Sequence, residues 1–163
     1  MEFTVDKASF EDLPDIKRLY EQLIDRSEDL GSMRNRYAEI LKDERILILV
    51  ARDMSGKTVG CLNGYICPII CWDCSSFMVV EDVIVDKEHR NCGIGKALMD
   101  SLDDFAERNG CVYSILVSTD KETRKDAHKF YKKMGYNEYQ DVKGFRKIYK
   151  NGPIMVRFGD ADE

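Results

Sequence analysis

The stretch "VEDVIVDKEHRNCGIGKALMDSLDDF", residues 80–105, runs from an apolar strand pattern through a glycine-containing loop into a helix pattern. Val83, Ile84 and Val85 end the strand pattern. After the loop, apolar residues recur at the spacing of one helix face: Ile94, Leu98, Leu102 and Phe105. The first backbone N–H groups of a helix have no partners within the helix and favour anions. This stretch therefore predicts an anion-binding loop between a strand and a helix.

The candidate binding residues of this loop are consecutive: Arg90, Asn91, Cys92, Gly93, Ile94, Gly95 and Lys96. The two glycines would let the backbone bend and let a ligand approach without a Cβ in the way. Arg90 could bind phosphate oxygens through two N–H groups. Lys96 adds positive charge where the helix dipole alone would prefer an acid, which is consistent with a bound anion. A glycine-rich helix start without any ligand is the alternative.

Three phosphate-binding patterns can be compared with this loop. "GIGKA" lacks the glycine spacing and the hydroxyl residue of a Walker loop. A dinucleotide-binding G-x-G-x-x-G loop would need a third glycine where Leu98 stands. "RNCGIG" fits the third pattern, R-x-x-G-x-G, which cradles the pyrophosphate of coenzyme A.

The rest of the chain predicts one mixed α/β (α+β) domain over residues 1–163. Strand patterns cover residues 3–9, 45–53, 57–66, 75–86, 111–118, 144–150 and 153–158. Helix patterns cover residues 10–25, 33–41, 94–108 and 123–136. This order, with neither repeats nor long linkers, favours a single sheet with helices packed on it.

Composition narrows the class of protein. The chain has 163 residues, 34% of them charged, and a net charge of −5, which disfavours nucleic-acid binding. No apolar run approaches the roughly 20 residues of a membrane helix. The N-terminal residues lack an apolar signal core, so we expect a cytoplasmic protein with no membrane partner.

Four of the six cysteines lie close together in the sequence: Cys61, Cys67, Cys71 and Cys74. Four thiolates can hold zinc, which would make the chain a small zinc-binding interaction protein. However, only Cys71 and Cys74 have the tight spacing of a zinc knuckle. Cys61 and Cys67 have the same parity in a strand pattern and would pack on one face. We therefore expect free thiols and no metal site.

A second motif, "AHKFYKKMGY" at residues 127–136, follows a strand pattern after the glycine loop. "VEDVIV", "RNCGIG", "CVYSILVS" and this motif, in this order, resemble the GNAT family of N-acetyltransferases. The resemblance extends over most of the chain. It implies a mixed, largely antiparallel central sheet that is flanked by about four helices and splays open to take acetyl-CoA.

The resemblance also implies roles for particular residues. The backbone at Val83, Ile84 and Val85 would pair with the pantetheine arm. Residues 91–96 and Arg90 would hold the pyrophosphate. Tyr131 stands at the position of the general acid. Glu81 stands at the position of the base, with Asp82, His128 and a water relay as alternatives. Strict alternation along the strand would place Glu81 on the same face as Val83 and Val85. Arg124 departs from the asparagine that many members carry, which puts one pantetheine contact in doubt.

The predicted function is transfer of an acetyl group from acetyl-CoA to a primary amine of a small molecule or peptide, directly within a ternary complex. A non-catalytic acyl-CoA-binding or sensing module on the same fold is the alternative. The first helical region carries Glu21, Asp25, Glu28 and Asp29, which would line a site for a cationic amine or form a solvated acidic face. The sequence leaves the amine and a homodimer open.

Overall fold

A computed structural model of the chain describes residues 1–24, 26–71 and 73–138. Its strands are β1 (Phe3–Lys7), β2 (Ile46–Asp53), β3 (Thr58–Pro68), β4 (Ser76–Val85) and β5 (Cys111–Leu116). Its α-helices are α1 (Leu13–Leu23), α2 (Leu30–Ile40), α3 (Ile94–Arg108) and α4 (Lys125–Lys133). Short 3-10 turns η1 (Phe10–Asp12), η2 (Lys87–His89) and η3 (Glu122–Arg124) precede α1, the glycine loop and α4.

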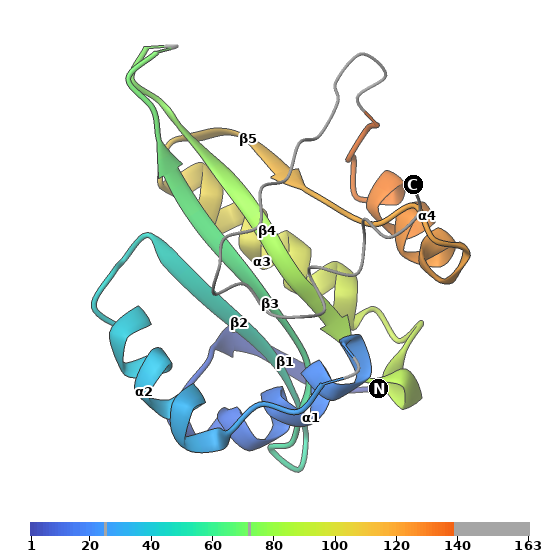
Figure 1. Cartoon of the computed structure of the whole chain (residues 1–163). Helices are drawn as coiled ribbons and strands as arrows, with labels where there is room; N and C mark the ends of the chain where they lie inside the picture. The colour runs from blue at the N-terminus through green and yellow to red at the C-terminus, as the bar shows by residue number, and fades with distance from the viewer. Residues whose placement is uncertain (25, 72, 139–163) are drawn as a thin grey trace, which may run out of the picture.

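The strands form one sheet in the order β1-β2-β3-β4-β5 (Figure 1). Neighbouring strands are antiparallel except β4 and β5, which are parallel. This confirms the predicted mixed, largely antiparallel sheet. The strand patterns at 144–150 and 153–158 lie outside the described residues.

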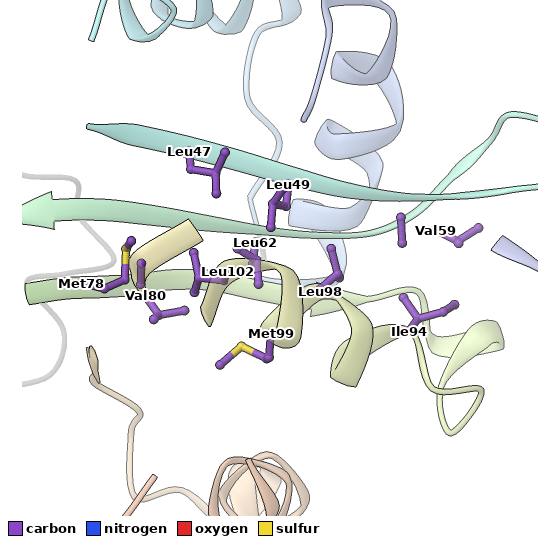
Figure 2. Packing of buried hydrophobic residues seen from close by; sticks show 12 residues of the cluster. Leu47, Leu49, Val59, Leu62, Met78, Val80, Ile94, Leu98, Met99 and Leu102 are labelled. Carbon is purple, nitrogen blue, oxygen red and sulfur yellow. The ribbon is translucent and has the colours of Figure 1, made fainter. Parts of the chain in front are cut away.

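One face of the sheet packs against α3. Ile94, Leu98, Met99 and Leu102 of this helix are almost completely buried. They meet apolar side chains of the strands, among them Leu49, Leu62 and Val80 (Figure 2). The helical stripe predicted from the sequence is therefore the face of α3 that packs on the sheet, and it fixes the position of the helix start.

The opposite face of the sheet is covered by α1 and α2. Leu13, Ile16 and Leu19 of α1 and Tyr37 of α2 form a second buried cluster with Val50, Cys61 and Ile84 of the strands. Asp29 begins α2 by accepting a hydrogen bond from the backbone of Ser32 at 2.7 Å. Because of this cap, α2 begins at Leu30 and not at residue 33 as the apolar pattern predicts.

Two buried carboxylates tie α1 to the strands. Asp12 is 4% exposed and accepts two hydrogen bonds from Arg52 of β2, at 2.8 and 2.6 Å, and one from Thr58 of β3 at 2.7 Å. Asp86, at the end of β4, pairs with Arg18 of α1. These contacts hold α1 in a fixed position beside the end of β4.

The six cysteines are free thiols, with Cys61 buried and Cys71, Cys74 and Cys92 exposed. Among the described residues, His, Cys, Asp and Glu side chains form no group of three or more suited to a metal ion. No helix in the described ranges combines the length and the apolar character that crossing a membrane requires.

We predict that Asp12→Asn destabilises the protein by roughly 2–3 kcal/mol at pH 7, because Arg52 loses its anion. Burial alone would raise the pKa of Asp12, but hydrogen bonds from Arg52, Thr58 and Ser9 hold it well below its usual range. The carboxylate therefore stabilises the fold above the pKa of about 3.9 that aspartate has in the unfolded chain. The wild type loses this contribution as the pH falls below about 4. The difference in the free energy of unfolding between the wild type and Asp12→Asn, measured with urea, should therefore become smaller below that pH.

Glu39→Gln is the control for this prediction. Glu39 pairs with Arg36, and both side chains are mostly exposed. Its loss should leave stability nearly unchanged at every pH, because exposed pairs contribute little. An equal effect of the two substitutions would contradict the role assigned to Asp12.

Candidate active site

Strand β4 contains one residue more than the stretch of β3 that it pairs with. Asn63 pairs with Glu81, and Cys61 pairs with Ile84. Between these two pairs lies one residue on β3 but two residues on β4. Asp82 lies inside this interval with φ +54°, in the left-handed region. An extra residue in this position is a β-bulge, which changes the direction of the side chains that follow it.

The bulge decides which side chains face which helix. Val83 and Val85 pack into the cluster on the α3 face, whereas Ile84 belongs to the cluster beneath α1. Glu81 pairs with Asn63, whose side chain reaches Tyr20 of α1, so Glu81 lies on the α1 face as well. The expectation that Glu81 shares a face with Val83 and Val85 is wrong, because the bulge interrupts the alternation.

The pairing of β4 with β5 ends just before the bulge. The last register pair between the two strands is Val80↔Leu116. Beyond this point the strands diverge (Figure 1), and residues 81–85 pair with β3 alone within the described part of the chain. The backbone predicted to bind the pantetheine arm, at Val83, Ile84 and Val85, is therefore at a strand edge that β5 does not cover.

The glycine loop begins at the end of this open strand edge. Gly93 precedes α3 with φ +84°, and no side chain of the described residues caps the start of the helix. Within the part of the chain that the structure describes, nothing lies within 4 Å of where a Cβ on Gly93 would stand. Arg90 folds back, and its Nε donates to the carbonyl of Val85 at 3.3 Å. The uncapped N–H groups of the first turn of α3 thus adjoin the end of β4.

The other loop residues contribute in different ways. Ile94 is 1% exposed, so only its backbone is available to a ligand. A Cβ on Gly95 would stand 3.2 Å from Cζ of Phe130, so this glycine makes room for α4 and not only for a ligand. Lys96 pairs with Asp100 at 2.5 Å on the exposed side of α3. Asn91 has φ +62°, and Cys92 is exposed.

The two predicted catalytic residues are Tyr131 of α4 and Glu81 of β4, and the charge of Glu81 acts on Tyr131. Burial raises the pKa of Tyr131, Arg124 opposes this increase, and Glu81 adds to it. Tyr131 therefore keeps its proton at neutral pH, which is the form a proton donor requires. Its ring also lies 5.5 Å from that of Phe130, which packs beside Gly95.

The two carboxyl groups at the bulge both have raised pKa values. For Glu81, burial is the main cause and the neighbouring Asp82 is the second. For Asp82, burial raises the pKa and a hydrogen bond from Asn63 opposes it. A carboxylate with a raised pKa is a better proton acceptor than an ordinary one, as a general base requires.

The alternative base, His128, lies on α4 with its Nε2 3.1 Å from the hydroxyl oxygen of Ser118. It and Tyr131 both line a hollow of about 870 Å³ beside β5 and α4. The imidazole and Ser118 are thus engaged with each other.

Most of the acidic residues proposed to line an acceptor site have partners within the chain. Glu21 binds Lys17 and Ser27, Glu28 pairs with Arg26, and Asp29 caps α2. Asp25 lies outside the described residues. This arrangement favours the solvated acidic face over a site for cations.

Asn63 and Tyr20 belong to no sequence motif and are not predicted as site residues. Asn63 is 6% exposed, and its Nδ2 donates to Asp82 at 2.8 Å and to the hydroxyl oxygen of Tyr20 at 3.1 Å. An asparagine in the apolar pattern "TVGCLNGYI" was the available signal, because buried amides are retained where they make hydrogen bonds.

A strand edge left open by β5, an uncapped helix start and a tyrosine near a carboxylate pair are the parts that an acyl transferase would need. The model of the Acetyltransferase (GNAT) family matches residues 11–136, and the chain belongs to this family. The resemblance seen in the sequence motifs is thereby confirmed.

Comparisons with individual proteins agree with this assignment. The chain is 28% identical over 112 residues to a glucosamine 6-phosphate N-acetyltransferase of Trypanosoma brucei brucei, covering 69% of each protein. The fold is similar to that of an acetyltransferase from Trypanosoma brucei, with TM-score 0.75 and 23% identity over 90% of this chain and 100% of the other. It is also similar to glucosamine-6-phosphate N-acetyltransferase from Arabidopsis thaliana, with TM-score 0.78 and 24% identity over 91% and 99% of the two chains.

We predict that Gly93→Ala destabilises the protein by about 1–2 kcal/mol, because a Cβ is strained in the left-handed conformation of this residue. Gly93→Asn should lower the stability less, since asparagine tolerates the left-handed conformation better than alanine does. Urea unfolding measures both effects. Equal stability of the alanine variant and the wild type would contradict the conformation described for the loop.

Proposed function

We propose that the chain is an acetyl-CoA-dependent N-acetyltransferase, with residues 1–163 acting as one catalytic domain. It transfers the acetyl group directly to a primary amine while both substrates are bound. The observation that carries this proposal is the position of Glu81. It lies just beyond the last register pair between β4 and β5, on the strand that leads into the glycine loop, and its charge acts on Tyr131.

The residues present fit coenzyme A. Among residues 1–24, 26–71 and 73–138, no side chain caps the N–H groups at the start of α3, and Gly93 leaves open space where a Cβ would stand. These groups, with Arg90, would hold the pyrophosphate. The backbone of residues 83–85, uncovered by β5, would pair with the pantetheine arm. When bound, acetyl-CoA would supply the acetyl thioester, and coenzyme A would leave as the thiol.

Two proton movements fall to the protein. A primary amine like that of lysine has a pKa near 10.4 and is mostly protonated at neutral pH, so it must lose a proton before it can attack. Glu81 accepts this proton, directly or through water, and its raised pKa suits the task. Tyr131, kept protonated by burial, donates to the departing sulfur.

The acceptor is proposed to be a small-molecule amine, and an amino-sugar phosphate is the first candidate. This choice is supported by the curated relative from Trypanosoma brucei brucei, which is named as a glucosamine 6-phosphate N-acetyltransferase. Because Glu21, Glu28 and Asp29 are engaged within the chain, a polycationic acceptor has less support.

We predict that Tyr131→Phe lowers kcat by about 100-fold or more while the protein still binds acetyl-CoA, because only the proton donor is lost. Binding is read from thermal unfolding with acetyl-CoA, CoA, NAD and ATP. A ligand at about a hundred times its Kd adds roughly 2.7 kcal/mol to the stability of the native state. Turnover is read by mass spectrometry of acetylated glucosamine 6-phosphate and of a panel of other acetylated amines. Thiol reagents that detect released CoA are avoided, because they would also react with the exposed Cys71, Cys74 and Cys92.

Tyr37→Phe is the matched control. The Tyr37 hydroxyl donates to the carbonyl of Ala8, away from the bulge, so its loss should lower stability and leave kcat unchanged. Stabilisation by acetyl-CoA without turnover of any amine would favour the non-catalytic acyl-CoA-binding module. Absence of stabilisation by either coenzyme A ligand would contradict the proposal.

A further inference from the structure

Asn63 of β3 connects α1 to the bulge through a single amide. Its Nδ2 uses one hydrogen for Asp82 Oδ2, at 2.8 Å, and lies 3.1 Å from the hydroxyl oxygen of Tyr20. Asn63 is almost fully buried. The Asp82 carboxylate is thus fixed from the interior of the protein.

The two carboxylates at the bulge differ from the other partly buried acids near α1. Asp12 and Asp86 each bind an arginine. For Glu81 and Asp82, by contrast, no Lys, Arg or His nitrogen lies within the 4 Å of an ion pair among residues 1–24, 26–71 and 73–138. The bulge places both on the α1 face, where Asp82 accepts a hydrogen bond from the amide of Asn63.

We propose that Asn63, anchored on Tyr20, is a positioning residue that holds Asp82 as the charged partner of Glu81, so that Glu81 is the group that accepts the proton. This inference rests on the proposed function, in which an amine must lose a proton at this site. Tyr20 acts through Asn63, and Asn63 acts through Asp82; neither touches the reacting atoms.

The physical chemistry of a carboxylate pair supports this division. A hydrogen bond to an ionised oxygen favours the ionised form, so Asn63 opposes the increase that burial causes in the pKa of Asp82. A negative Asp82 disfavours a second negative charge beside it, and the pKa of Glu81 rises. The titrations of two interacting carboxyl groups are coupled. Because the Asn63 amide donates to Asp82, Asp82 ionises first and Glu81 keeps the proton that the pair releases last.

The titratable groups that face this pair stay neutral near neutral pH. They come from α1, β3 and α4 and are phenols or a thiol: Tyr20, Cys61, Tyr65 and Tyr131. Burial raises the pKa of each of them. Arg124 acts on Tyr131 from η3. Asp82 is therefore the charged group that affects Glu81 most directly.

The test is a titration of side-chain carboxyl carbons by NMR on the full chain, which requires no acceptor. In Asp82→Asn, the midpoint of Glu81 should fall by about one pH unit, because the like charge is removed. Asparagine tolerates the left-handed conformation of residue 82, so the bulge is retained. In Asn63→Leu, the midpoint of Asp82 should rise by about one unit, and in Tyr20→Phe it should rise less.

Asp103→Asn is the control, because Asp103 is a partly buried acid of α3 whose pKa is raised by burial and by other acids of that helix. It should leave the midpoint of Glu81 unchanged. An unchanged Glu81 midpoint in Asp82→Asn, or an unchanged Asp82 midpoint in Asn63→Leu, overturns the inference.

The pH dependence of kcat/KM adds a second readout. The acid limb rises with pH as Glu81 loses its proton, so in Asp82→Asn this limb should move to lower pH by the same amount as the Glu81 midpoint. A limb that stays in place while the midpoint moves overturns the assignment of Glu81 as acceptor. Failure to acetylate any amine would refute the proposed function, whereas the carboxyl titration would still decide the roles of Asn63 and Asp82.

Discussion

The arrangement of the site depends on the single extra residue in β4. With the bulge at Asp82, Glu81 and Asp82 lie beside Asn63 on the face covered by α1, while Val83 and Val85 pack toward α3. A regular strand would place Glu81 on the same face as these valines. Asp82, which has the left-handed conformation, accepts a hydrogen bond from Asn63, so a buried amide on β3 is joined directly to the bulge of β4.

Much of the fold could be predicted from the sequence, because apolar residues recur at helical spacing in the helices and in apolar runs in the strands. The stripe that begins at Ile94 identified α3, and the apolar runs identified the strands. The start of α2 could not be placed, because it depends on the Asp29 cap and not on an apolar position. The bulge was also missed, since "VEDVIV" is equally compatible with a regular strand.

The loop and the family could be predicted because glycine spacing and the second motif are local patterns. What those patterns leave open is how side chains far apart in the sequence meet. Nothing local shows that Gly95 makes room for Phe130, or that Tyr20, Asn63 and Asp82 share one hydrogen-bonded group. Asn63 in an apolar strand and the acidic pair in another were the only signs of this contact in the sequence.

We propose that the open edge of β4 and the start of α3 together bind coenzyme A. Backbone ¹H–¹⁵N spectra of the full chain, recorded while CoA is added, examine both segments at once. We expect the amide signals of residues 83–85 and 91–96 to shift together and to saturate at the same CoA concentration. Saturable shifts confined to other parts of the chain, with both of these segments unchanged, would contradict it.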